Sequence, residues 1–407
     1  MELTRRKLLE MTALLVVAPK ADPMERRAAD VIRAYSDEGD HRTATAVDRA
    51  SANALLARAR ATGASVSLEP FDLSRVDTVT AFAEIDGRQI DGLPMFDGPF
   101  TGSAGVTGRI GVIGSDRPIA WTRIGPNGEA ELRRMRDGSK HAAIVAVTVG
   151  GKTGLCPVNA GWFSEPFGPP VLQLSSEQLR AIEAAATQNR EVRLVTDVTR
   201  SRVQAVNVVA LVRGTDPALA PVCVMTPRSG WHANASERGG GLVCWLETMR
   251  AVVAAKSPKG GRGLLRTVRF IASSGHELGH LGLRDYLRRN PTLARSAYAW
   301  VHFGANIGAS TGDTGMTPSD DWLRDAALRA LEPQGLGAIR QSPAEQVAGE
   351  AATIKEEDGH FVSFIGRNDW FHNPRDVWPD VVDLKAVAQY ARATADLTLA
   401  LANAPDA

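Results

Sequence analysis

Several features that would assign a protein to a class are scarce in this chain. The 407 residues include three cysteines, Cys156, Cys223 and Cys244, and this odd, scattered set excludes a disulfide framework and favours buried small side chains. No stretch reaches the roughly 18 consecutive apolar residues of a transmembrane helix, so a membrane span is excluded. Lys and Arg number 47 against 46 for Asp and Glu, a balance that gives no electrostatic footprint for nucleic acid. What remains is a globular composition, long enough for two domains.

The pattern of apolar residues predicts an α/β protein. Helix is expected over residues 24–66, followed by a strand at 65–71. From about residue 201 onward, strands alternate with helices, which predicts a mainly parallel central sheet with both faces covered by helices. The expected strands are 204–212, 222–225, 267–272 and 297–303, and the expected helices are 241–254, 284–288 and 384–402.

Residues 88–200 differ from the rest because Gly and Pro are frequent and short strands alternate with turns. Strands are expected at 110–113 and 142–147, and a helix at 177–185. This texture predicts a small, β-rich inserted domain. It either covers the active-site cleft or is a second structural domain, and the sequence does not separate these alternatives.

The N-terminus carries a basic segment before an apolar run. Thr4-Arg5-Arg6-Lys7-Leu8-Leu9 precedes residues 11–18, a pattern similar to a twin-arginine export signal. This predicts a signal over residues 1–22 and a periplasmic or secreted protein. The alternative is a basic first helix in a cytoplasmic protein.

One string is a candidate metal motif. His276-Glu277-Leu278-Gly279-His280 matches H-E-x-x-H, which binds zinc when a helix places both histidines on one face. The residues before it, from Thr267 to Ala272, are typical of a buried strand, and Ser273-Ser274-Gly275 interrupts the chain. We therefore expect His276 and Glu277 on a strand-to-helix loop, which argues against the helical zinc site.

The loop has a second interpretation, since active sites of α/β sheets form beyond the carboxyl ends of the strands. Residues 274–282 resemble the Glu-Glu loop of the co-catalytic zinc aminopeptidases, the group that includes aminopeptidase S, glutamate carboxypeptidase and glutaminyl cyclase. Residues 370–380 resemble their closing motif. The resemblance implies a zinc exopeptidase-like fold with a main domain over 23–87 and 201–407, and a protease-associated domain over 88–200.

The resemblance also assigns roles to single residues. Glu277 stands at the position of a zinc ligand of the family, and His276 stands at the position of the glutamate that is the family's catalytic base. His280 is then an ordinary residue of the helix surface. His372 matches the terminal histidine ligand, and Glu237 replaces the bridging aspartate.

Other ligand positions have lost their donors. The segment after residues 222–225 is Thr226-Pro227-Arg228, without the first histidine, and Ala305 stands at the later aspartate position. Arg238 adds a fixed positive charge beside Glu237, which is unfavourable next to divalent ions. We therefore expect at most one zinc, or none, with these candidate metal ligands: Glu237, Glu277, His372 and His232.

Three functions follow from this altered site. The first is a hydrolase of amide or peptide-like bonds with at most one metal, acting on a peptide or small molecule. The second is a metal-free enzyme in which His276 and Glu277 form a catalytic pair. The third is a non-catalytic binding protein on the peptidase fold. The expected substrate contacts are Arg228, Arg238, Ser229 and Asn306, while the substrate and oligomeric state are left open.

Overall fold

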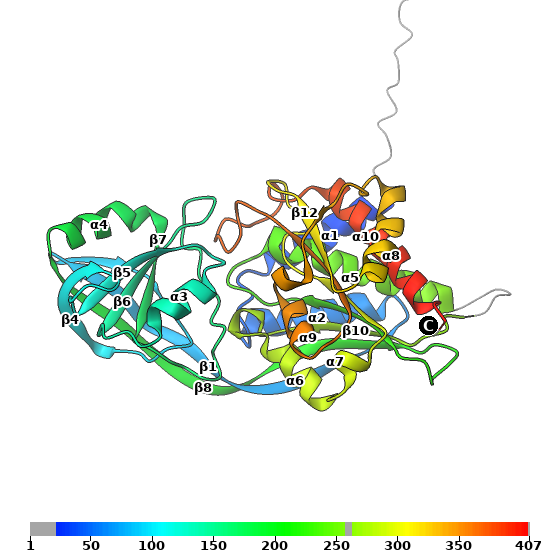
Figure 1. Cartoon of the computed structure of the whole chain (residues 1–407), viewed down its shortest axis with the longest axis horizontal. Helices are drawn as coiled ribbons and strands as arrows, with labels where there is room; N and C mark the ends of the chain where they lie inside the picture. Colours follow the sequence, from blue (N-terminus) through cyan, green and yellow to red (C-terminus); the bar gives the residue numbers. More distant parts are fainter. Residues whose placement is uncertain (1–21, 257–262, 406–407) are drawn as a thin grey trace, which may run out of the picture.

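The computed structural model describes residues 22–256 and 263–405, and it divides into two lobes (Figure 1). Two long antiparallel strands, β1 (Ser65–Ile85) and β8 (Glu191–Val212), run through both lobes and join them. Most of the expected export signal, residues 1–21, lies outside the described part of the chain, so export stays a prediction.

The larger lobe is built on a mixed, mostly parallel sheet, which confirms the predicted α/β class. Strands β9, β10, β11 and β14 are parallel, and the antiparallel pairs β8–β10 and β12–β14 flank them. From one edge to the other, the order is β13-β12-β14-β11-β9-β10-β8-β1. The newly named strands are β9 (Val222–Pro227), β10 (Val268–Ser273), β11 (Ala299–Phe303), β12 (Thr314–Pro318), β13 (Arg340–Gln341) and β14 (Phe361–Gly366).

Helices cover both faces of this sheet. Val222 and Val224 of β9 belong to the core beneath one set of helices, whereas Cys223 and Met225 belong to the core on the opposite face. This alternation follows from the two-residue period of a strand, and burial on both faces explains the unbroken apolar runs. The first set is α1 (Pro23–Asp37), α2 (Ala46–Arg60), α5 (Ala235–Lys256), α8 (Asp321–Leu331) and α10 (Leu384–Ala402), and the second is α6 (Leu281–Arg289), α7 (Leu293–Ser296) and α9 (Glu350–Glu356).

The N-terminal helical region differs from the prediction. It is not one helix over 24–66, because α1 and α2 are separated by residues 38–45. Thr45 ends this interruption by capping α2, its side-chain oxygen accepting a hydrogen bond from Asp48 N. The connecting segment matters for function because it carries Thr43 into the interior of the larger lobe. In contrast, the C-terminal helix has the predicted bounds.

The smaller lobe also contains a parallel sheet, a feature that its Gly- and Pro-rich sequence does not reveal. Adjacent strands from β4 to β7 run parallel, and β6 is buried along its whole length. One face packs against α3, and the other packs against α4. The elements are β2 (Arg88–Asp91), β3 (Leu93–Pro94), β4 (Gly102–Val112), β5 (Ile119–Ile124), α3 (Glu129–Arg136), β6 (Ala143–Thr148), β7 (Val171–Ser175) and α4 (Leu179–Thr187). The domain boundaries and the protease-associated character stay predictions.

The predictions about the cysteines and about membrane-spanning helices can be compared with this fold. Cys156, Cys223 and Cys244 are free and buried, as expected for small core side chains. Within residues 22–256 and 263–405, no helix is both long enough and apolar enough to cross a membrane.

Candidate functional site

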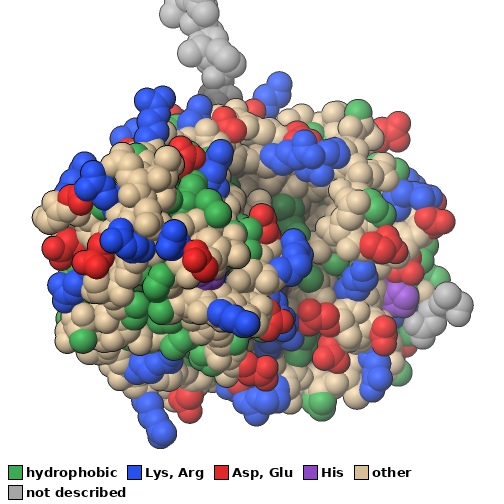
Figure 2. All heavy atoms as spheres, turned by 60° about the vertical axis from the view of Figure 1, so that its left-hand side comes forward, with side chains coloured by type: hydrophobic (Ala, Val, Ile, Leu, Met, Phe, Trp, Pro, Cys, Tyr) green, Lys and Arg blue, Asp and Glu red, His purple; other side chains and the backbone are tan. Residues whose placement is uncertain are grey.

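A cleft of about 720 Å³ opens between the two lobes at the carboxyl ends of the parallel strands. The larger lobe lines it with the loop after β10, the ends of β11 and β14, and the β12–β13 pair. The smaller lobe adds the start of α3 and the segment around Asn159. The molecular surface is hollowed on this side, with Lys and Arg side chains at the margin (Figure 2). This position is where α/β sheets bind ligands.

The H-E-L-G-H string lies on the loop that the sequence predicts. Strand β10 ends at Ser273, a 3₁₀ turn covers His276–Leu278, and α6 begins at Leu281. Gly275 and Gly279 adopt left-handed φ values of 84° and 79°. The two histidines therefore do not lie one turn apart on a helix face, and the helical zinc site is excluded.

The smaller lobe is docked directly on these loops. Ala160 N donates a hydrogen bond to the carbonyl oxygen of Glu277 at 2.8 Å, and Trp231 Nε1 donates to Asn159 Oδ1 at 2.9 Å. His372 Nδ1 donates to the carbonyl oxygen of Pro157 at 2.5 Å. The contacts explain Gly279, since a Cβ there would lie 2.4 Å from the carbonyl oxygen of Gly161. The smaller lobe is therefore part of the site.

Glu277 points away from the cleft into the larger lobe. One carboxylate oxygen accepts hydrogen bonds from Thr43 N at 2.7 Å and Thr43 Oγ1 at 2.6 Å, and the other accepts from Ser229 Oγ at 2.7 Å. Burial raises the pKa of Glu277, and these hydrogen bonds oppose the shift. Ser229 Oγ in turn accepts from Gly275 N at 2.8 Å. Glu277 and Ser229 thus hold the loop in shape, which argues against the predicted roles of Glu277 as metal ligand or catalytic partner of His276 and of Ser229 in substrate binding.

His276 does line the cleft, but its carboxylate neighbour is Glu350 instead of Glu277. His276 Nδ1 lies 3.7 Å from Glu350 Oε1, which also accepts a hydrogen bond from Ser273 Oγ at 2.5 Å. Burial first, and then the charge of Arg238, hold the pKa of His276 well below its ordinary value. The imidazole is therefore neutral at pH 7, the form that accepts a proton. Glu350 begins α9, far along the sequence and outside any motif.

His280 is not an ordinary helix-surface residue. It caps α6 with a φ of 62°, lines the cleft and stacks on His276 with a ring-centroid distance of 5.0 Å. Its Nδ1 lies 3.0 Å from Thr353 Oγ1. Burial lowers the pKa of His280 to about 3, so the stacked pair is uncharged at neutral pH.

Glu237 and Arg238 form a buried ion pair at the start of α5. Arg238 Nη2 lies 2.7 Å from Glu237 Oε1, and His372 Nε2 lies 3.5 Å from the same oxygen. Burial alone would raise the pKa of Glu237, but Arg238 and His372 lower it to about 2. Asp376 accepts hydrogen bonds from the backbone N of Ser236 and of Glu237, each at 2.9 Å, and so caps this helix end. Arg238 is thus occupied with Glu237, which argues against its predicted contact with substrate.

The other predicted site residues lie in structural contacts. Arg228 is fully buried and pairs with Asp48 at 2.7 Å, which argues against a substrate clamp. Asn306 is buried with its side chain donating to the carbonyl oxygen of Gly366 at 3.3 Å. His232 lies 3.8 Å from Asp40 and does not line the cleft.

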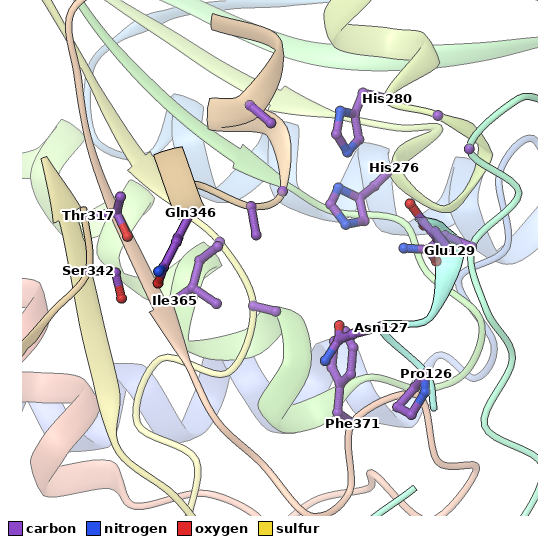
Figure 3. A pocket seen from close by; sticks show the side chains of 18 of the residues that line it. Pro126, Asn127, Glu129, His276, His280, Thr317, Ser342, Gln346, Ile365 and Phe371 are labelled. Atoms are coloured by element: carbon purple, nitrogen blue, oxygen red, sulfur yellow. The ribbon is translucent and has the colours of Figure 1, made fainter. Parts of the chain in front are cut away.

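Sequence reasoning identified His276 but missed Glu129, Thr317, Ser342 and Gln346 of the cleft. His276, His280 and Glu129 lie on one side of it, and Thr317, Ser342 and Gln346 lie on the opposite side (Figure 3). Burial raises the pKa of Glu129 to about 7, although a hydrogen bond with Asn159 opposes this. Glu129, Thr317, Ser342 and Gln346 come from both lobes and match no motif, so only the fold brings them beside the two histidines.

Comparisons with known proteins agree with this architecture. No family model and no curated protein matches the sequence. Among solved structures, a zinc aminopeptidase from Bacillus subtilis is 17% identical with a TM-score of 0.74, covering 93% of this chain and 97% of that one. The fold is that of the zinc aminopeptidases. An aminopeptidase from Aneurinibacillus sp. strain AM-1 gives 13% identity, a TM-score of 0.72 and coverage of 94% and 95%. A peptidase M28 precursor from Shewanella amazonensis is 16% identical with a TM-score of 0.70, covering 94% of this chain and 95% of that one.

The donor set of this chain does not fit the metal centre that the fold implies. Among the described residues, no three His, Cys, Asp or Glu side chains converge in a group that could hold a metal ion. The reasons are specific to the residues present. Arg238 pairs with the carboxylate of Glu237. The carboxylate of Glu277 accepts hydrogen bonds from Thr43 and Ser229. The side chain of Ala305 has no atom that could bind a metal.

Proposed function

We propose that this protein hydrolyses peptide-like amide bonds in the cleft between its lobes, with His276 as general base. The likeness to aminopeptidase structures supports a peptide-like substrate. The observation that carries the proposal is the position of His276, which lines the cleft at the end of β10 with a carboxylate behind it. We further propose that this chemistry does not depend on the two-metal centre, because the residues at those positions are engaged elsewhere.

The geometry supports a role for each nitrogen of His276. Nδ1 of His276 is directed to Glu350, so Nε2 is the nitrogen that faces the substrate. Nε2 takes a proton from water, the resulting hydroxide adds to the amide carbon, and the tetrahedral intermediate expels the amine, which takes the proton back from His276. Glu350 orients the ring and stabilises the imidazolium while it exists. A separation of 3.7 Å is long for a hydrogen bond, and such contacts shorten when substrate closes the site.

Substitution of His276 and Glu350 tests this role. We expect His276→Ala to lower kcat/KM on aminoacyl and dipeptidyl anilides by about 10²-fold or more. Glu350→Gln keeps a similar shape but removes the charge, so kcat should fall more than KM rises. The matched control is His360→Ala, since His360 is half-exposed and pairs with Asp320 outside the cleft. Equal turnover by His276→Ala and wild type would remove His276 from the mechanism.

Ligand binding without catalysis is the second candidate function. The observation that favours it is the Glu237–Arg238 ion pair. This pair engages Glu237, the residue that the resemblance places at the position of a bridging metal ligand. If the protein only binds ligands, peptides should bind in the cleft and the wild-type chain should turn over no anilide.

A further inference from the structure

The wall of the cleft opposite His276 is built from the short strand pair at the sheet edge. Gly315 of β12 pairs with Arg340 of β13, and Ser342 N donates to the carbonyl oxygen of Met316 at 2.9 Å. Because side chains alternate along strands, Gly315 and Thr317 share one face with Arg340 and Ser342. All four of these residues line the cleft, whereas Met316 is buried on the other side. We call this set of four the β12–β13 edge.

Arg340 is held in a fixed position on this edge. Its Nε donates to Asp313 Oδ2 at 2.8 Å. A Cβ at Gly315 would lie 2.5 Å from Arg340 Cζ, so the guanidinium lies flat against the glycine backbone in space that any other residue would fill. Its two terminal nitrogens donate no hydrogen bond within the described part of the chain. The group is therefore oriented in advance, with its donor edge unused.

The charge around Arg340 is not fully compensated. Asp313 is shared with Arg367, whose Nε lies 3.9 Å away. Among the described residues that line the cleft, arginines outnumber carboxylates. They are Arg133, Arg284, Arg340 and Arg367 against Glu129 and Glu356. An anion in the cleft would thus meet a net positive field.

We infer that the β12–β13 edge binds a carboxylate of the ligand, so that the cleft selects acidic peptides. A planar guanidinium with two parallel N–H donors matches the two oxygens of a carboxylate, and the hydroxyls of Thr317 and Ser342 add neighbouring donors. Gln346 stands beside them in Figure 3. The inference rests on the proposed function only in taking this cleft as the substrate site, and it adds the chemical class of that substrate.

Binding of matched peptides measures this selectivity without any turnover. Calorimetry on the His276→Ala protein compares Glu-Ala-Ala, Ala-Glu-Ala and Ala-Ala-Glu amides with the same peptides carrying glutamine. We expect at least one acidic peptide to bind about tenfold more tightly than its glutamine partner, since hydrogen bonds to charged groups are the strong ones. Adding Arg340→Ala should abolish this preference, and Arg340→Lys should keep part of it. The matched control is Arg324→Ala, an arginine of α8 that pairs with Asp321 outside the cleft.

Two results would overturn the inference. One is equal affinity for the acidic and neutral member of every pair, and the other is a preference that survives Arg340→Ala. Either result leaves the proposed hydrolysis standing, because turnover is measured separately on the wild-type chain with neutral anilides. Loss of turnover with an intact acidic preference would instead remove only the catalytic proposal.

Discussion

Replacement of Arg238 by alanine tests whether the buried ion pair at the start of α5 stabilises the chain. The substitution leaves Glu237 buried without the guanidinium 2.7 Å away. In the folded chain, the pKa of Glu237 is about 2, against an ordinary value of 4.5, and this difference corresponds to about 3 kcal/mol of stability at pH 7. Breaking a buried pair typically costs roughly 3–5 kcal/mol, in agreement with that value.

The pH dependence of this loss has a defined sign. Because folding lowers the pKa of Glu237, its contribution is fully present above pH 4.5 and is lost as the pH falls through about 2. Urea unfolding at pH 7 should therefore show a loss of about 3 kcal/mol for Arg238→Ala, and the loss should shrink below pH 4.5. Adding Glu237→Gln should recover part of it, and Arg324→Ala serves as an exposed control. A loss below about 1 kcal/mol at pH 7, or no recovery in the double variant, would show that the ion pair does not stabilise the fold.

Three further predictions concern the loop and its surroundings. Gly279→Ala should lower the free energy of unfolding by about 1–3 kcal/mol, because φ is 79° and the new Cβ meets Gly161 O at 2.4 Å; an unchanged urea midpoint would contradict the docking. Glu277→Gln should cost about 1–3 kcal/mol in the same assay, since one buried hydrogen bond from Thr43 or Ser229 loses its acceptor; an unaffected stability would show that the carboxylate is not structural. Burial lowers the pKa of His302 to about 3, so as the pH falls below 6.5 the unfolded chain takes up a proton at His302 that the folded chain does not. Between pH 7 and pH 5, the free energy of unfolding of wild type should therefore fall by about 2 kcal/mol more than that of His302→Asn. Equal falls in the two proteins would contradict this.

Much of the fold can be predicted from the sequence because it depends on local patterns. The apolar run before Ser273 and the two glycines around His276 predict a strand-to-loop transition, and the structure has one there. The helix over 384–402 is likewise predicted by its pattern. Helix α3 was missed because its eight residues carry mostly charged side chains, and only Leu132 and Arg136 are buried.

The site is less predictable because its contacts span long separations. Position in a motif identifies His276, but it cannot show that Glu277 turns toward Thr43 while Glu350 lies behind the histidine. Both carboxylates look equally available in sequence. Neither carboxylate lines the cleft, and the break between α1 and α2, which brings Thr43 to Glu277, is a tertiary feature that no periodicity encodes.

The central claim is that amide hydrolysis in the cleft relies on His276 and not on a bound metal. The most direct measurement is kcat/KM for aminoacyl anilides before and after dialysis against a strong zinc chelator, with His276→Ala alongside. We expect unchanged turnover after chelation and a loss of about 10²-fold or more in the variant. Turnover that disappears on chelation and returns with added zinc would contradict it.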